Sequence, residues 1–202
     1  MTAYTDMYKD AIGLMKSEDL KVFNIGLEPE QVRAALGQNP FGQGCLLARR
    51  LVQKDVRFVE VTLGNWDTHS DNFEGTPKKS AVLDQAMSTL LADLQAKGLL
   101  DKTLVVLGTE FGRTPRINDR DGRDHHNKAF TCLLAGAEIK GGQAYGKTDG
   151  RGAEVEDGAV SIPDFNATIA QAIGLSVKRV EHSPGGRPLK VADKGKAIEG
   201  LL

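Results

Sequence analysis

Three of the four histidines in this chain lie between residues 64 and 126, together with a high density of carboxylates. Imidazole and carboxylate groups are ligands of zinc, manganese and iron, so this region could bind a divalent metal. We expect zinc first, with manganese, calcium or iron as alternatives. The candidate ligands are Asp67, His69, Glu110, Asp124, His125 and His126.

The first candidate pair is Asp67 and His69, which flank a single residue. In an extended loop, side chains two residues apart point to the same side, as two ligands of one cation must. An isolated Asp-x-His more often caps a helix or shapes a loop, and for the pair alone we favour that structural role. The second group, residues 124–126, makes a metal site the stronger interpretation.

Arginines accompany these ligands at positions 113, 116, 120 and 123. Guanidinium groups bind phosphate or sulfate oxygens, which favours an oxyanion substrate, although a purely structural cluster would form ion pairs. Arg113 and Arg123 are the candidate catalytic residues. Glu110 ends a predicted strand, where it is either a cap for the next residues or a metal ligand, and we favour the ligand.

Hydrophobic patterns indicate the elements that would position these loops. Residues 58–63 alternate like a strand, a helix is expected from Pro77 to a stop at Gly98, and residues 104–107 form a short apolar strand. Strand, helix and strand predict a right-handed parallel crossover, which places both strand ends at one sheet edge. We therefore expect an α/β fold, a three-layer αβα sandwich with a mainly parallel sheet. A third strand is expected at residues 129–134 and a last helix from Pro163 to Gly174.

Composition limits the classes of partner. The 202 residues fit a single domain, with residues 1–55 as a helical lead-in and residues 182–202 as a surface tail. With 26 basic and 27 acidic residues, binding to nucleic acid or to an anionic membrane surface is not expected. The apolar runs are far shorter than the roughly 20 residues that span a bilayer. Cys45 and Cys132 are expected to be free thiols.

The order of the motifs resembles the alkaline phosphatase and sulfatase superfamily, and within it a bacterial family of unknown function. The resemblance covers most of the chain and implies an alkaline phosphatase-like fold. The residues that carry it are Gly-Asn-Trp-Asp-Thr-His at 64–69, the strand approach at 99–107, Glu-Phe-Gly-Arg-Thr-Pro at 110–115, Gly-Arg-Asp-His at 122–125, Ile-Pro-Asp at 162–164 and Gly-Arg-Pro-Leu at 186–189.

The resemblance implies one metal held by Asp67, His69 and His125, with Glu110 in the place of a ligand to a second metal. Enzymes of the superfamily also carry an N-terminal strand with a nucleophile. The chain is similar to the C-terminal half of its family, so we expect either a piece of a longer protein or a short natural relative with a partial site. No signal-peptide pattern opens this sequence, and export of a longer parent protein to the periplasm stays open.

The expected function is metal-dependent hydrolysis of a small phosphate or sulfate ester. Two alternatives stay open: a metal-stabilised, non-catalytic binding or interaction module, and a phosphomutase-like isomerase. Because the implied nucleophile is missing, we expect this chain alone to hydrolyse generic esters weakly or not at all. The sequence does not indicate an oligomeric state.

Overall fold

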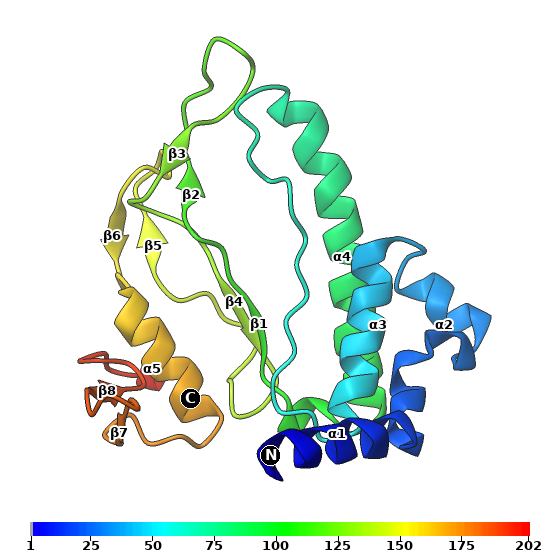
Figure 1. Cartoon of the computed structure of the whole chain (residues 1–202). Coiled ribbons are helices and arrows are strands. Elements are labelled where there is room, and N and C mark those ends of the chain that lie inside the picture. Colours follow the sequence, from blue (N-terminus) through cyan, green and yellow to red (C-terminus); the bar gives the residue numbers. More distant parts are fainter. Residues whose placement is uncertain (1) are drawn as a thin grey trace. The chain divides into compact units, whose positions relative to one another are not determined.

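The computed structural model of the protein describes residues 2–202 (Figure 1). It forms two compact units, the first made of the chain up to Asn65 together with Pro77–Leu94, and the second made of Trp66–Thr76 and Gln95–Leu202. Helix α4 (Asn72–Ala96) contributes to both units. The expectation of one domain over residues 1–202 therefore stays a prediction.

The first unit is helical. Helix α3 (Pro40–Val52) begins where the side chain of Asn39 accepts a hydrogen bond from the Gly42 N–H and Pro40 occupies the first turn. Leu36, Leu46 and Leu94 are fully buried and form the centre of the unit's core. The other elements are α1 (Thr2–Met15), α2 (Glu30–Ala35) and 3-10 helices at Glu18–Phe23 and Ile25–Leu27.

A cluster of ion pairs lies inside this unit around Arg49, whose side chain is 2% exposed. Arg49 pairs with Glu28 at 2.7 Å and with Asp93 at 2.8 Å. Arg50 also pairs with Glu28 and donates to the backbone oxygens of Lys21 and Val22. A buried guanidinium is tolerated only when it is paired, so this cluster fixes α3 against the 3-10 helices before it.

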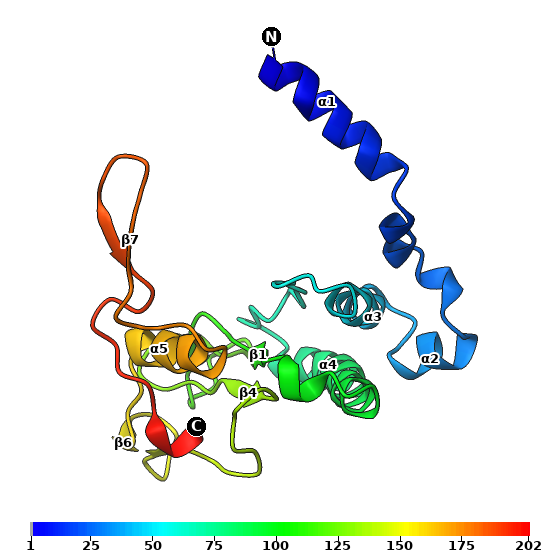
Figure 2. The same ribbon diagram turned by 90° about the horizontal axis from the view of Figure 1, so that it is seen from below.

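The second unit holds short antiparallel strand pairs, a helix and a returning tail. Within it, the C-terminal segment returns past α5 (Ile162–Ala172) (Figure 2). There the Lys196 N–H donates to Asp164 and the Ile198 N–H donates to the buried Thr168 hydroxyl. The strand pairs are β1 (Val105–Leu107) with β4 (Leu133–Ala135), β2 (Gly112–Arg113) with β3 (His125–His126), β5 (Lys147–Thr148) with β6 (Val155–Asp157), and β7 (Val180–His182) with β8 (Pro188–Lys190); 3-10 helices span Leu100–Lys102 and Glu199–Leu201.

The expected three-layer αβα sandwich with a mainly parallel, alkaline phosphatase-like sheet is wrong. Each sheet in the described part of the chain is a two-stranded antiparallel pair. Residues 58–63 run outside any strand pair, and β1 pairs with β4 instead of with that segment. Alternating apolar residues, here Val59, Val61 and Leu63, are typical of an extended backbone. A strand also needs a hydrogen-bonded neighbour, and the alternation does not identify one.

Both long helices that the sequence predicts are present in the structure, with different bounds. Helix α5 (Ile162–Ala172) begins one residue before the expected start at Pro163 and ends before the expected stop at Gly174, and the expected central helix exists as α4. However, α4 begins at Asn72, so Pro77 lies inside the helix and does not open it. The first turn is already formed by the N–H groups of Glu74 and Gly75, which both donate to the Asp71 carbonyl. No helix among residues 2–202 has the length and hydropathy needed to cross a membrane.

Candidate metal centre

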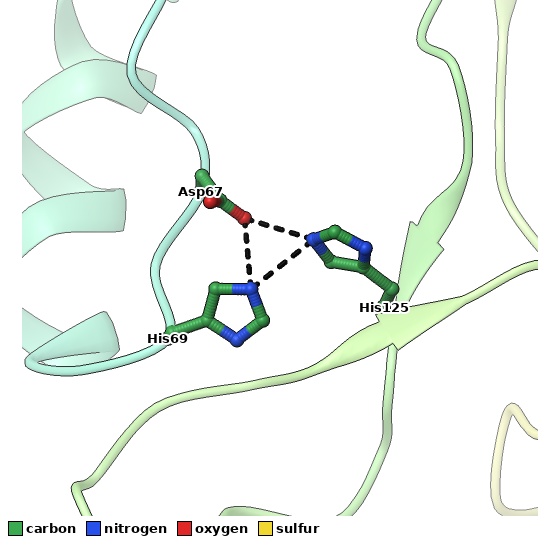
Figure 3. A group of neighbouring side chains, drawn as sticks. All are labelled: Asp67, His69 and His125. Carbon is green, nitrogen blue, oxygen red and sulfur yellow. Dashed lines mark hydrogen bonds and ion pairs between the residues drawn. The ribbon is translucent and has the colours of Figure 1, made fainter.

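Asp67, His69 and His125 converge in the second unit (Figure 3). Asp67 and His69 come from the loop before α4, and His125 comes from β3. Each offers one ligand atom, and these atoms lie within 4.8 Å of one another. Asp67 Oδ1 is 3.0 Å from His125 Nε2 and 3.2 Å from His69 Nε2, and the two Nε2 atoms are 3.1 Å apart.

These separations suit one cation. Zinc bonds of about 2.0–2.1 Å in a tetrahedron hold neighbouring ligand atoms roughly 3.3 Å apart. The observed separations of 3.0 to 3.2 Å therefore need only a small outward movement of three side chains. Two imidazoles and one carboxylate also make a donor set that metal enzymes use. The protein thus has a possible metal-binding triad.

The pairing of β2 with β3 places His125 and separates it from His126. Arg113 lies opposite His125 in the register, and successive side chains of a strand point to opposite faces. His125 therefore reaches the triad, whereas His126 Nε2 points away and lies 2.7 Å from the Ala153 carbonyl oxygen. The Phe111 ring packs against His125 with a centroid distance of 4.4 Å, which restricts that imidazole.

Backbone hydrogen bonds fix the loop that carries Asp67 and His69. The His69 N–H donates to the Asp67 carbonyl, a tight turn that brings the two side chains to one side. The Thr68 hydroxyl donates to Asn72 at the start of α4, and the Thr68 carbonyl accepts from the Arg123 N–H. The two ligand-bearing segments are therefore joined directly.

Two charged residues contact the triad without belonging to it. Asp124 Oδ1 lies 2.9 Å from His69 Nδ1, so it can accept a hydrogen bond from an Nδ1–H group, which leaves Nε2 unprotonated and free as a ligand. The Arg113 guanidinium lies 2.7 Å from Asp67 Oδ1 and 5.6 Å from the Phe111 ring centre. The triad thus has an imidazole-orienting carboxylate on one side and a cation on the other.

Hydrogen bonds keep both carboxylates in the form that binds metal. Bonds from His125 and then Arg113 lower the pKa of Asp67, and bonds from His69 and then Asn118 lower the pKa of Asp124. In each case these bonds outweigh the opposing effect of partial burial. Both groups are therefore ionised at neutral pH.

The structure brings together some of the predicted site residues and leaves others apart. Glu110 is exposed and stands outside the triad, as does His126, so their roles as ligands stay predictions. Arg123 donates to the carbonyls of Thr114 and Pro115, which fixes its own loop. Sequence reasoning missed Asn118, which hydrogen-bonds Asp124; a lone Asn in a polar loop gives no signal of such a contact.

Comparison with known proteins gives a family but no characterised relative. No curated protein and no solved structure matches the chain. The resemblance to the alkaline phosphatase and sulfatase superfamily is wrong, because the matching family model carries no such assignment and the sheets are short antiparallel pairs. Short motifs that supply ligands can occur on unrelated scaffolds, so their order alone was a weak guide to the fold. The model that matches residues 1–202 is that of "Protein of unknown function (DUF1501)", and the chain belongs to this family.

Proposed function

We propose that this protein is a metal-dependent hydrolase of phosphate or sulfate esters, with zinc held by Asp67, His69 and His125. The observation that carries the proposal is the convergence of three ligand atoms from two separate segments of the chain. Structural zinc sites normally have four protein ligands, whereas catalytic sites have three and leave one position for water or substrate. A three-ligand centre therefore favours catalysis.

Exposure of the ligands supports access by a substrate. The side chains of Asp67 and His125 are 63% and 54% exposed. A bound zinc ion would lower the pKa of its water to about 7, which supplies a nucleophile at neutral pH without a reactive side chain. The expectation that this chain hydrolyses generic esters weakly or not at all rested on the nucleophile that the superfamily resemblance implies. Because that resemblance is wrong, the missing nucleophile is not an argument against hydrolysis by a metal-bound water.

The cation beside the triad supports an anionic substrate. Arg113 lies next to Asp67 and presents a planar group that can bind two oxygens of a phosphate or sulfate. Arg123 donates to two backbone carbonyls at 2.7 and 2.6 Å, whereas Arg113 faces Asp67 and donates to one carbonyl, that of Arg123, at a longer 3.4 Å. We therefore assign the contact with the substrate anion to Arg113 and the shaping of the loop to Arg123.

The test combines metal analysis with turnover. Protein purified without added chelator would be analysed for zinc, manganese and iron, then assayed with p-nitrophenyl phosphate and p-nitrocatechol sulfate before and after treatment with a chelator. The proposal expects about one zinc per chain and turnover that the chelator abolishes and zinc restores, because the ion supplies the nucleophile.

Matched variants separate the site from the rest of the chain. His125→Ala should lose both zinc and turnover, whereas His182→Ala, at an exposed position in β7, should keep both. Bound zinc without any turnover would instead support the metal-stabilised binding module. Absence of metal from folded protein, with no uptake on titration, would refute the proposal.

A further inference from the structure

The loop between β2 and β3 folds around the side chain of Asn118, which uses both ends of its amide. Its Oδ1 accepts hydrogen bonds from the N–H groups of Arg120 and Gly122, each at 3.0 Å. Its Nδ2 donates to the backbone oxygen of His69 and to Asp124 Oδ1, each at 3.1 Å. One end therefore shapes the loop, and the other end holds two groups beside the triad.

This loop also fixes the backbone of His69 by close contact. A Cβ atom at Gly122 would lie 2.1 Å from both the carbonyl carbon and the carbonyl oxygen of His69, so only glycine allows the two segments to approach this closely. The N–H groups of Asp71 and Asn72 donate to backbone oxygens at positions 120 and 121. The placement of His69 therefore depends on the conformation that Asn118 stabilises.

We infer that Asn118 is a positioning residue of the metal centre, acting through Asp124 and through the backbone of His69. The inference rests on the proposed metal-binding function. Asp124 Oδ1 meets both Asn118 Nδ2 and His69 Nδ1, so the donated hydrogen bond from Asn118 holds the carboxylate where it faces the imidazole. Groups that orient a ligating histidine in this way typically affect metal affinity by about 10- to 100-fold.

Asn118→Asp is the sharpest variant, because it keeps the size of the side chain and an oxygen for the N–H groups of Arg120 and Gly122. It replaces the donor that faces Asp124 with a second anionic oxygen, which repels that carboxylate. Asn118→Ser is the second variant, since its shorter side chain reaches Asp124 less well. Asn166→Asp, on the exposed side of α5, is the control for the same chemical change.

Zinc affinity would be measured for each protein by competition with a chromophoric chelator, with circular dichroism of the metal-free proteins as the check on folding. Asn118→Asp and Asn118→Ser should keep the native spectrum and bind zinc about 10- to 100-fold more weakly, while Asn166→Asp should match the wild type. In an Asp124→Ala background, Asn118→Ser should cost less affinity than it does alone, because part of its effect passes through Asp124.

Four results would overturn the inference. Wild-type affinity in both Asn118 variants would show that the contact does not position the centre. Fully additive losses with Asp124→Ala would show that Asn118 does not act through that carboxylate. Loss of the native spectrum in both variants would show that Asn118 holds the fold in general. A wild-type protein that binds no zinc would refute the proposed function itself, and the inference with it.

Discussion

Replacing Glu28 with Ala tests the ion-pair cluster that organises the helical unit. The Glu28 side chain is 14% exposed, and it accepts hydrogen bonds from both Arg49 and Arg50. Removing one partner of a buried ion pair costs about 3–5 kcal/mol, because it leaves a buried charge without compensation. Arg49 would keep Asp93, so we expect the lower end of that range, about 3 kcal/mol.

Urea unfolding followed by circular dichroism measures this cost. With a denaturant slope of about 1–3 kcal/mol per molar urea, a loss of about 3 kcal/mol lowers the midpoint by roughly 1–3 M. Glu30→Ala is the control, since Glu30 pairs with Arg33 but is 63% exposed, and surface pairs contribute about 0–1 kcal/mol. Equal losses in the two variants would refute the argument that burial makes the Glu28 pairs important.

The same cluster predicts how stability depends on pH. The hydrogen bond from Arg49 lowers the pKa of Glu28 in the folded protein, and Arg50 adds to that effect against the opposing influence of burial. A lowered folded-state pKa gives stability that is present above the unfolded value of about 4.3 and is lost as the pH falls through the folded value. As the pH falls below 5, the free energy of unfolding of the wild type should therefore decrease more than that of Glu28→Gln. The difference between the two proteins should have the pH dependence of one carboxylate that titrates at a lower pH in the folded state.

Two further predictions concern buried groups in each unit. Burial raises the pKa of the Cys45 thiol to about 11, so Cys45 should react with a disulfide reagent at neutral pH much more slowly than the half-buried Cys132; equal rates in the native protein would contradict this burial. The fully buried Thr168 hydroxyl accepts from the Ile198 N–H, so Thr168→Val should destabilise the protein by about 1–3 kcal/mol in urea unfolding; an unchanged midpoint would show that the tail contact contributes nothing.

The residues of the site were easier to predict than the fold that holds them. Asp67, His69 and His125 stand out because the chain has only four histidines, and imidazole and carboxylate are both metal ligands. The separation of His125 from His126 was not predictable, because the orientation of neighbouring side chains depends on the pairing of β3 with β2. Pairing is a long-range property, and local patterns do not contain it.

The same limit explains the wrong sheet. The short apolar run around Val105 is a strand, as expected. Its hydrophobicity does not indicate which strand it pairs with, or whether the pair is parallel or antiparallel. The start of α4 was misplaced for a local reason, because Pro77 is favoured in a first turn and so suggested a helix start five residues too late. The role of Asn118 could not be predicted from the sequence, because it depends on a contact with His69, which is far away along the chain.

X-ray absorption at the zinc edge identifies the atoms bound to the metal, so it tests the proposed ligand set itself. For protein loaded with one equivalent of zinc, we predict two imidazole ligands and light-atom ligands at about 2.0–2.1 Å, with one imidazole lost in His125→Ala and both retained in His182→Ala. A spectrum without imidazole, a sulfur ligand at about 2.3 Å, or an unchanged spectrum in His125→Ala would contradict a centre built from Asp67, His69 and His125.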